Sequence, residues 1–77
     1  MKNKYCYPRV RDLREDSDKR QSDIAAVIKE HTTQYQRWER GESEIPVHIV
    51  IELCKLYNVS ADYILGFTNK KKPLPKD

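Results

Sequence analysis

A chain of 77 residues has the size of one small domain, since domains usually run to roughly 50–200 residues, and it leaves little room for an enclosed catalytic cavity. Hydrophobic residues make up 38% and charged residues 35%, with only two Gly and four Pro, which is typical of a soluble helical domain. The net charge is +3, but residues 15–69 hold six basic and ten acidic groups, so the bulk charge does not mark a nucleic-acid binder.

The first two predicted helices are short and carry narrow apolar stripes. Pro8 is a good first helical residue, and the pattern predicts a helix over Pro8–Asp16 with Val10 and Leu13 on one face. After a break at residues 17–20, a second helix is predicted over Gln21–Ile28. Its apolar face consists of Ile24, Ala25 and Ile28.

The next two predicted helices are separated by a connection at residues 42–45. The third covers Thr32–Arg40 and stops at Gly41, because glycine readily adopts the left-handed backbone conformation that ends a helix. The fourth starts at Pro46 and ends near Tyr57, before Asn58 in the cap position. We expect its core-facing stripe to consist of Val47, Val50, Ile51, Cys54 and Tyr57.

A fifth helix is predicted over Ala61–Leu65, capped by Ser60 and closed by Gly66. No segment alternates with period two, so we expect no sheet. Residues 70–77 are too charged and too rich in Pro to fold alone. The chain is therefore expected to be all-α, with one domain at residues 1–69 that begins with a basic arm, residues 1–7, and with a basic tail at 70–77.

Cysteine and histidine spacing gives no sign of a metal centre or of catalysis. Cys6 and Cys54 lie far apart in a chain without secretory features, and with His31 and His48 they match no zinc-finger pattern. No nucleophile and base sit on a recognisable scaffold. No run approaches the roughly 18 apolar residues of a membrane helix. We therefore expect a cytoplasmic protein that is not an enzyme, has no metal or cofactor and does not contact the membrane.

The third predicted helix presents a polar stripe. Only about three residues separate it from the second helix, which is the geometry of a helix-turn-helix. The stripe lies within an arc of about 140° at 100° per residue and consists of Thr32, Thr33, Gln36, Arg37 and Arg40. Tyr35 and Trp38 lie on the opposite arc with Gln34 and Glu39, so we expect both aromatic rings to face the core.

This stripe is chemically suited to the major groove of DNA. Arg37 can bond guanine through two hydrogen bonds and Gln36 can pair with adenine, while Thr32 and Thr33 offer hydroxyls to base edges and methyls to thymine. An ordinary solvated helix face is the alternative, because surface helices usually have polar outer faces.

The sequence resembles a known family. Q-S-D-I-A-A-V-I followed by T-T-Q-Y-Q-R-W-E-R-G is similar to the helix-turn-helix of the lambda-repressor-like group, which includes Cro, phage repressors and bacterial regulators of the xenobiotic-response-element (XRE) type. The resemblance extends over about residues 8–68 and includes the ending N-V-S-A-D-Y-I-L-G. It implies a compact five-helix DNA-binding domain whose second and third helices form the helix-turn-helix.

The resemblance also implies roles for individual residues. Gln21 matches the glutamine that binds a DNA phosphate and braces the recognition helix, and Arg14 and Glu39 match an ion pair between the first and third helices. The positions that meet base edges are Thr32, Thr33 and Arg37, with Gln36 close by. Gln21 is expected to reach the DNA backbone, and Arg40 and Ser43 match positions that reach the backbone or an edge base. Apart from the resemblance, we also expect Lys29 and His31 to contact the DNA backbone.

Four residues depart from the family pattern in and around the turn: Lys19, Lys29, Glu30 and His31. Lys29 stands where the turn often has Gly or Asn, and a left-handed Lys costs roughly 1 kcal/mol or more relative to Gly. We therefore expect a looser turn than in the family.

The resemblance favours a sequence-specific transcriptional regulator of double-stranded DNA. A repressor that binds an inverted repeat as a homodimer is the expected form, because one module of this size reads few base pairs. A protein-interaction module is the alternative. In that case the same fold would bind a protein partner, as an antitoxin does, and the acidic body of the domain favours this slightly.

Overall fold

The structure is a computed structural model that describes residues 5–71, and its regular elements are five helices. They are α1 (Pro8–Asp16), α2 (Gln21–Val27), α3 (Thr32–Arg40), α4 (Val47–Tyr57) and α5 (Ala61–Leu65). Within these 67 residues there is no strand, so the expected all-α, five-helix fold is confirmed. Two boundaries were wrong by one residue, because Ile28 and Pro46 are cap residues outside the helices.

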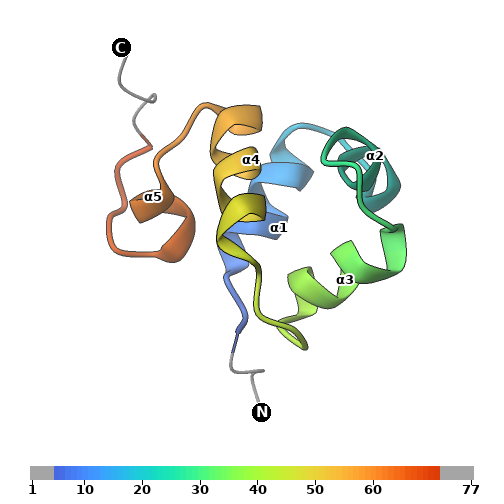
Figure 1. The fold of residues 1–77 in the computed structure, drawn as a ribbon. Coiled ribbons are helices and arrows are strands. Elements are labelled where there is room, and N and C mark those ends of the chain that lie inside the picture. Colours follow the sequence, from blue (N-terminus) through green and yellow to red (C-terminus); the bar gives the residue numbers. More distant parts are fainter. Residues whose placement is uncertain (1–4, 72–77) are drawn as a thin grey trace.

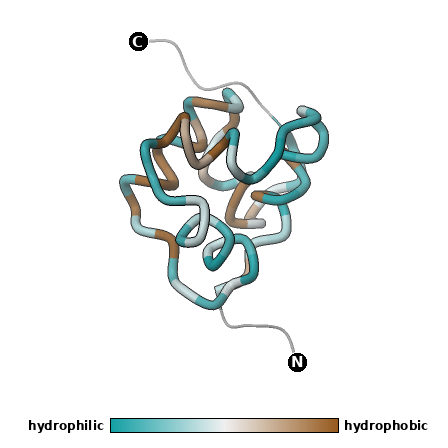
Figure 2. The backbone as a smooth tube through the Cα atoms, turned by 90° about the vertical axis from the view of Figure 1, so that its right-hand side faces the viewer, coloured by the Kyte–Doolittle hydropathy of each residue, from teal (hydrophilic) through white to brown (hydrophobic). Residues whose placement is uncertain are grey.

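The helices surround a single core. In Figure 1, α4 stands in the centre, with α5 on one side and the α2–α3 pair on the other. α2 packs on α3, α1 contacts both α3 and α5, and α4 packs on α5. Brown apolar stretches and teal hydrophilic ones alternate along the tube in Figure 2, as expected for amphipathic helices that each bury one face.

The core-facing stripes of the first three helices are those expected from sequence. Val10 and Leu13 of α1 are buried, and Tyr35 and Trp38 of α3 are buried too, as predicted. The predicted apolar residues around α2 are also in the core, namely Ile24, Ala25 and Ile28. Because large aromatic rings fix α3 from behind, its other face is held toward solvent.

The predicted stripe of α4 was right for three of its five residues, because Cys54 is buried and Val50 and Tyr57 pack against the core. Val47 is 75% exposed and Ile51 is 47% exposed, whereas Ile49 and Leu53 are buried together with Cys54. Apolar residues occupy most of the circumference of α4, so helical periodicity alone did not single out one face. Packing against α5 and the rest of the core determines the buried face.

Every helix is followed by a residue in the left-handed region of the backbone. These residues, which include all those with positive φ between residues 5 and 71, are Asp18, Lys29, Gly41, Asn58 and Gly66. A left-handed residue lets the next backbone N–H groups bond to the last carbonyls of the helix, which ends the helix sharply. Three of the five are not Gly, so the short connections of this fold are made at some conformational cost.

The segment before α1 packs against the domain where the structure describes it. Residues 5–7 do not form a free arm, because Tyr7 packs against the core and the backbone of Cys6 lies against Gly41. Residues 1–4 of the expected arm and 72–77 of the expected tail lie outside the described residues. Across the described range, no helix has the length and apolar character needed to cross a membrane.

Candidate nucleic-acid interface

The connection between α2 and α3 is a closed turn. Lys29 has a φ of +59°, and its N–H donates to the Ala26 carbonyl at 3.2 Å. The N–H of Glu30 donates to the Ala25 carbonyl at 2.8 Å, which completes a Schellman motif. The expectation of a looser turn was therefore wrong: two backbone hydrogen bonds hold Lys29 in a conformation that its side chain disfavours.

The outer face of α3 holds the residues predicted to read bases. Thr33 and Arg37 are exposed, and Thr32 and Gln36 are half-buried. The Arg37 guanidinium makes no hydrogen bond or ion pair with any residue that the structure describes. It is therefore available to an external partner without breaking a contact in the protein.

A buried ion pair joins α1 to the back of α3. Arg14 Nε donates to Glu39 Oε2 at 2.7 Å, and Arg14 Nη2 donates to Glu39 Oε1 at 3.1 Å. Only 13% of the Arg14 side chain and 3% of the Glu39 side chain are exposed. Arg14 Nη1 also donates to the Lys19 carbonyl at 2.9 Å, so the same guanidinium holds the connection between α1 and α2.

The surroundings of Glu39 keep it ionised. Burial alone would raise its pKa, but hydrogen bonds, chiefly from Arg14, outweigh this and lower the pKa below its ordinary value. In turn, the hydrogen bond to Glu39 raises the pKa of Arg14. Burial raises the pKa of Tyr57 to about 12, so this hydroxyl stays neutral and adds no charge beside Glu39.

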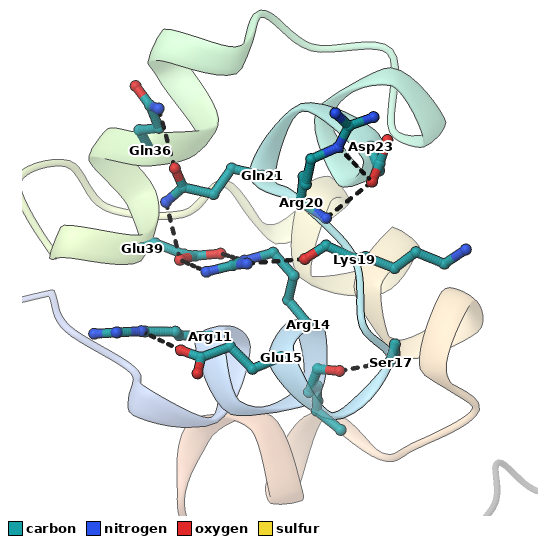
Figure 3. Close-up of polar contacts among 11 residues, drawn as sticks. Arg11, Arg14, Glu15, Ser17, Lys19, Arg20, Gln21, Asp23, Gln36 and Glu39 are labelled. Carbon is teal, nitrogen blue, oxygen red and sulfur yellow. Dashed lines mark hydrogen bonds and ion pairs between the residues drawn. The ribbon is translucent and has the colours of Figure 1, made fainter.

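Two glutamines extend this network to the exposed side of α3 (Figure 3). Gln21, the first residue of α2, donates from Nε2 to Glu39 Oε1 at 3.1 Å. Gln36 donates from Nε2 to Gln21 Oε1 at 3.0 Å. Gln21 thus braces α3 by bonding two of its residues.

The residues predicted to reach the DNA backbone lie around both ends of α3. Lys29 and His31 are exposed before its first turn, and Ser43 is half-buried after its last. Arg40 is exposed and forms an ion pair with Glu42. A phosphate contact by Arg40 would therefore compete with a carboxylate of the protein itself.

Sequence reasoning missed the role of Arg9. Its Nη1 donates to the Tyr63 carbonyl at 2.7 Å and to the Thr68 carbonyl, its Nη2 donates to Asn69 Oδ1, and its guanidinium carbon lies 4.2 Å from the centre of the Tyr63 ring. More than 50 residues separate these partners, so no local pattern could reveal the contact. Arg9 and Arg14 serve the fold and are not free cations for DNA.

The geometry of α2 and α3 agrees with the comparison to known proteins. A helix-turn-helix family model matches residues 10–64, which include all of α2, α3 and α4. This chain belongs to the lambda-repressor-like helix-turn-helix family. The family consists of DNA-binding transcriptional regulators, and α2 and α3 form the helix-turn-helix of this chain.

One curated relative is the uncharacterized HTH-type transcriptional regulator YobD of Bacillus subtilis (strain 168). It is 33% identical over 69 residues, which are 90% of this chain and 61% of the relative. The helix-turn-helix protein thus spans about three-fifths of the length of that regulator. No solved structure matches the chain.

Proposed function

We propose that this helix-turn-helix protein is a cytoplasmic repressor that binds a specific inverted repeat in double-stranded DNA as a homodimer, with α3 in the major groove. The observation that carries the proposal is the state of Arg37 on α3. Its guanidinium is exposed and has no partner among residues 5–71, while buried Tyr35 and Trp38 hold the helix from behind. An exposed, unpaired guanidinium on a fixed helix suits the major groove, where guanine presents two hydrogen-bond acceptors.

The residues around Arg37 divide into two groups. Base contacts fall to Arg37 and its neighbours on the exposed stripe, Thr32, Thr33 and Gln36. Backbone contacts fall to residues at the ends of α2 and α3: Gln21, Lys29, His31, Arg40 and Ser43. Backbone contacts position the protein and base contacts specify the sequence, so both groups are needed for an operator to be selected.

A dimer is supported by the small reading surface and by an apolar groove away from α3. A single recognition helix contacts few base pairs. Dimers of helix-turn-helix proteins place two recognition helices on half-sites one helical turn apart. Val47 and Ile51 of α4 and Leu65 of α5 line an open groove of about 310 Å³. A second copy that covered these side chains would remove apolar surface from water. A dimer on an operator can repress simply by occupying promoter DNA.

Selection of sites from a random duplex library tests the proposal. We expect an inverted repeat with half-site centres about 10 base pairs apart and a binding constant that falls steeply with salt. Analytical ultracentrifugation of the protein on the selected duplex should give two copies per site. Failure to enrich any sequence would contradict specific DNA binding and favour a protein-interaction module, whereas one copy on a single half-site would contradict only the dimer.

A further inference from the structure

The hydrogen bonds that lead from Glu39 to Gln36 have a fixed direction. A glutamine amide can turn either its oxygen or its nitrogen to a partner, whereas an ionised carboxylate can only accept. Since Glu39 is buried and ionised, Gln21 must turn its NH₂ group toward it, as the 3.1 Å contact from Nε2 to Glu39 Oε1 requires. The opposite orientation would place a carbonyl oxygen against a carboxylate oxygen.

The same constraint passes from Gln21 to Gln36. With its nitrogen toward Glu39, Gln21 presents Oε1 to α3, and this oxygen can only accept a hydrogen bond. Gln36 therefore turns its own NH₂ group to Gln21, at 3.0 Å. Its carbonyl oxygen consequently points away from Gln21, as Figure 3 shows. The buried carboxylate thus determines which atom Gln36 presents to a partner outside the protein.

We propose that Gln36 reads one base of the operator through Oε1, that this base carries an exocyclic amino group, adenine or cytosine, and that Glu39 sets this choice through Gln21. The inference rests on the proposed DNA binding and adds a rule for one position of the site. In the major groove adenine presents its N6 amino group and cytosine its N4 amino group, whereas guanine and thymine present the carbonyl oxygens O6 and O4. A carbonyl oxygen of Gln36 accepts from the first pair and is repelled by the second.

Gln21 and Glu39 act here as positioning residues. Gln21 still has one N–H that is not bound to Glu39, and this group suits a phosphate oxygen, which can only accept. One side chain therefore both clamps the DNA backbone and orients the amide of Gln36. Removal of the Gln21 amide should therefore have two separate effects. Loss of the phosphate contact should weaken binding to every sequence, and loss of the bond to Gln36 should remove one base preference.

The test compares three variants of the full chain, Gln36→Met, Gln21→Met and the control Gln34→Met, on the selected operator. Methionine has nearly the length of glutamine but no amide. Gln34 lies on the same helix outside the polar stripe that contains Gln36, and it is half-buried like Gln36. Duplexes that carry each of the four bases at every position of one half-site give a preference profile for each variant, and circular dichroism checks that each one is folded.

For the wild type we expect one position where adenine or cytosine is favoured over guanine and thymine by about fivefold or more. Gln36→Met should remove the preference at that position alone. Gln21→Met should weaken binding to all duplexes and allow guanine or thymine at that position, while the other positions keep their preferences. Gln34→Met should keep the wild-type profile.

Two results would overturn the proposal. A wild-type profile retained by Gln36→Met would show that Gln36 does not read a base, and an undiminished adenine or cytosine preference in Gln21→Met would show that Gln21 does not set the choice. Nuclear magnetic resonance of the free protein gives an independent measure, because the side-chain amide signals of Gln36 should move in Gln21→Met and stay in Gln34→Met. If the wild type selects no sequence at all, the proposed function itself has failed, and this outcome is distinct from both.

Discussion

Gly41, the residue that ends α3, lies directly against the backbone of Cys6. A methyl group on Gly41 would come within 2.7 Å of the Cys6 nitrogen and 2.8 Å of its Cα. The C-terminal end of α3 is thus tied to the segment that precedes α1. No side chain fits between the two, so the contact depends on glycine in two ways, through space and through its φ of +78°.

Gly41→Ala should destabilise the protein by about 2–4 kcal/mol, because it combines a left-handed alanine with a clash against backbone atoms. Gly66→Ala is the matched control. Gly66 has a φ of +91° but no atom within 4 Å of the position of a methyl group, so only the conformational cost, about 1–2 kcal/mol, applies. Urea unfolding of both variants measures the difference, and equal losses would contradict the role of the Cys6 contact.

Glu39→Gln should remove a contribution to stability that depends on pH. The pKa of Glu39 is lowered in the folded protein, so its ion pair with Arg14 stabilises the fold fully above the ordinary pKa of 4.5 and progressively less as the pH falls through the folded value. At pH 7 the variant should be less stable by about 3 kcal/mol, since a partly buried Arg14 loses its charged partner.

Thermal unfolding of the wild type and of Glu39→Gln between pH 2 and 7 checks the direction in which this contribution to stability changes with pH. The difference between them should shrink as the pH falls below the ordinary value, because wild-type Glu39 then becomes neutral too. A difference that stays constant with pH would mean that the charge of Glu39 contributes nothing to folding.

Trp38→Ala should lower the free energy of unfolding by about 3–5 kcal/mol, the usual range for a buried aromatic residue. Trp38 is 5% exposed and lies in the core behind the reading face of α3. Trp38→Phe keeps most of the apolar volume and should lose less. A Trp38→Ala variant with unchanged stability but no DNA binding would mean that the ring contacts DNA and not the core.

Arg37→Ala should cost about 1–3 kcal/mol on the selected operator and relax the preference at one base pair. Arg40→Ala is the comparison on the same helix, because Arg40 already pairs with Glu42 and is expected to reach only the backbone. It should weaken binding to all sequences alike. The affinity of both variants for operator and for unrelated duplexes is measured by titration. An equal loss of affinity for all duplexes in Arg37→Ala would mean that Arg37 contacts phosphates and not a base.

Deletion of residues 70–77 should weaken binding to all duplexes without changing base preference, if the lysines of this tail bind phosphates. The slope of log affinity against log salt should flatten by about 0.9 for each phosphate that the tail neutralises in the full chain. Binding measured at several salt concentrations for the deleted and full chains gives both slopes. Identical slopes would show that the tail binds no phosphate.

The local structure of this protein and its family could be predicted from the amino-acid sequence. Helix ends depend on neighbouring residues, so Pro8, Gly41 and Gly66 predicted where α1 starts and where α3 and α5 stop. The burial of Tyr35 and Trp38 also followed from sequence, because the polar stripe of α3 left only one apolar arc to face the core. The order of these elements, together with the motifs around α2 and α3, was enough to identify the helix-turn-helix.

Contacts between distant segments became visible only in the folded domain. Val47 and Ile51 are exposed because the apolar arc of α4 is wider than the face that the core can cover, so packing and not periodicity determined which part is buried. Arg9 holds the segment after α5 through Thr68 and Asn69, across more than 50 residues of chain, and no local pattern encodes that distance. The direction of the amide of Gln36 likewise depends on Glu39 and Gln21, which the packing of α2 on α3 brings together.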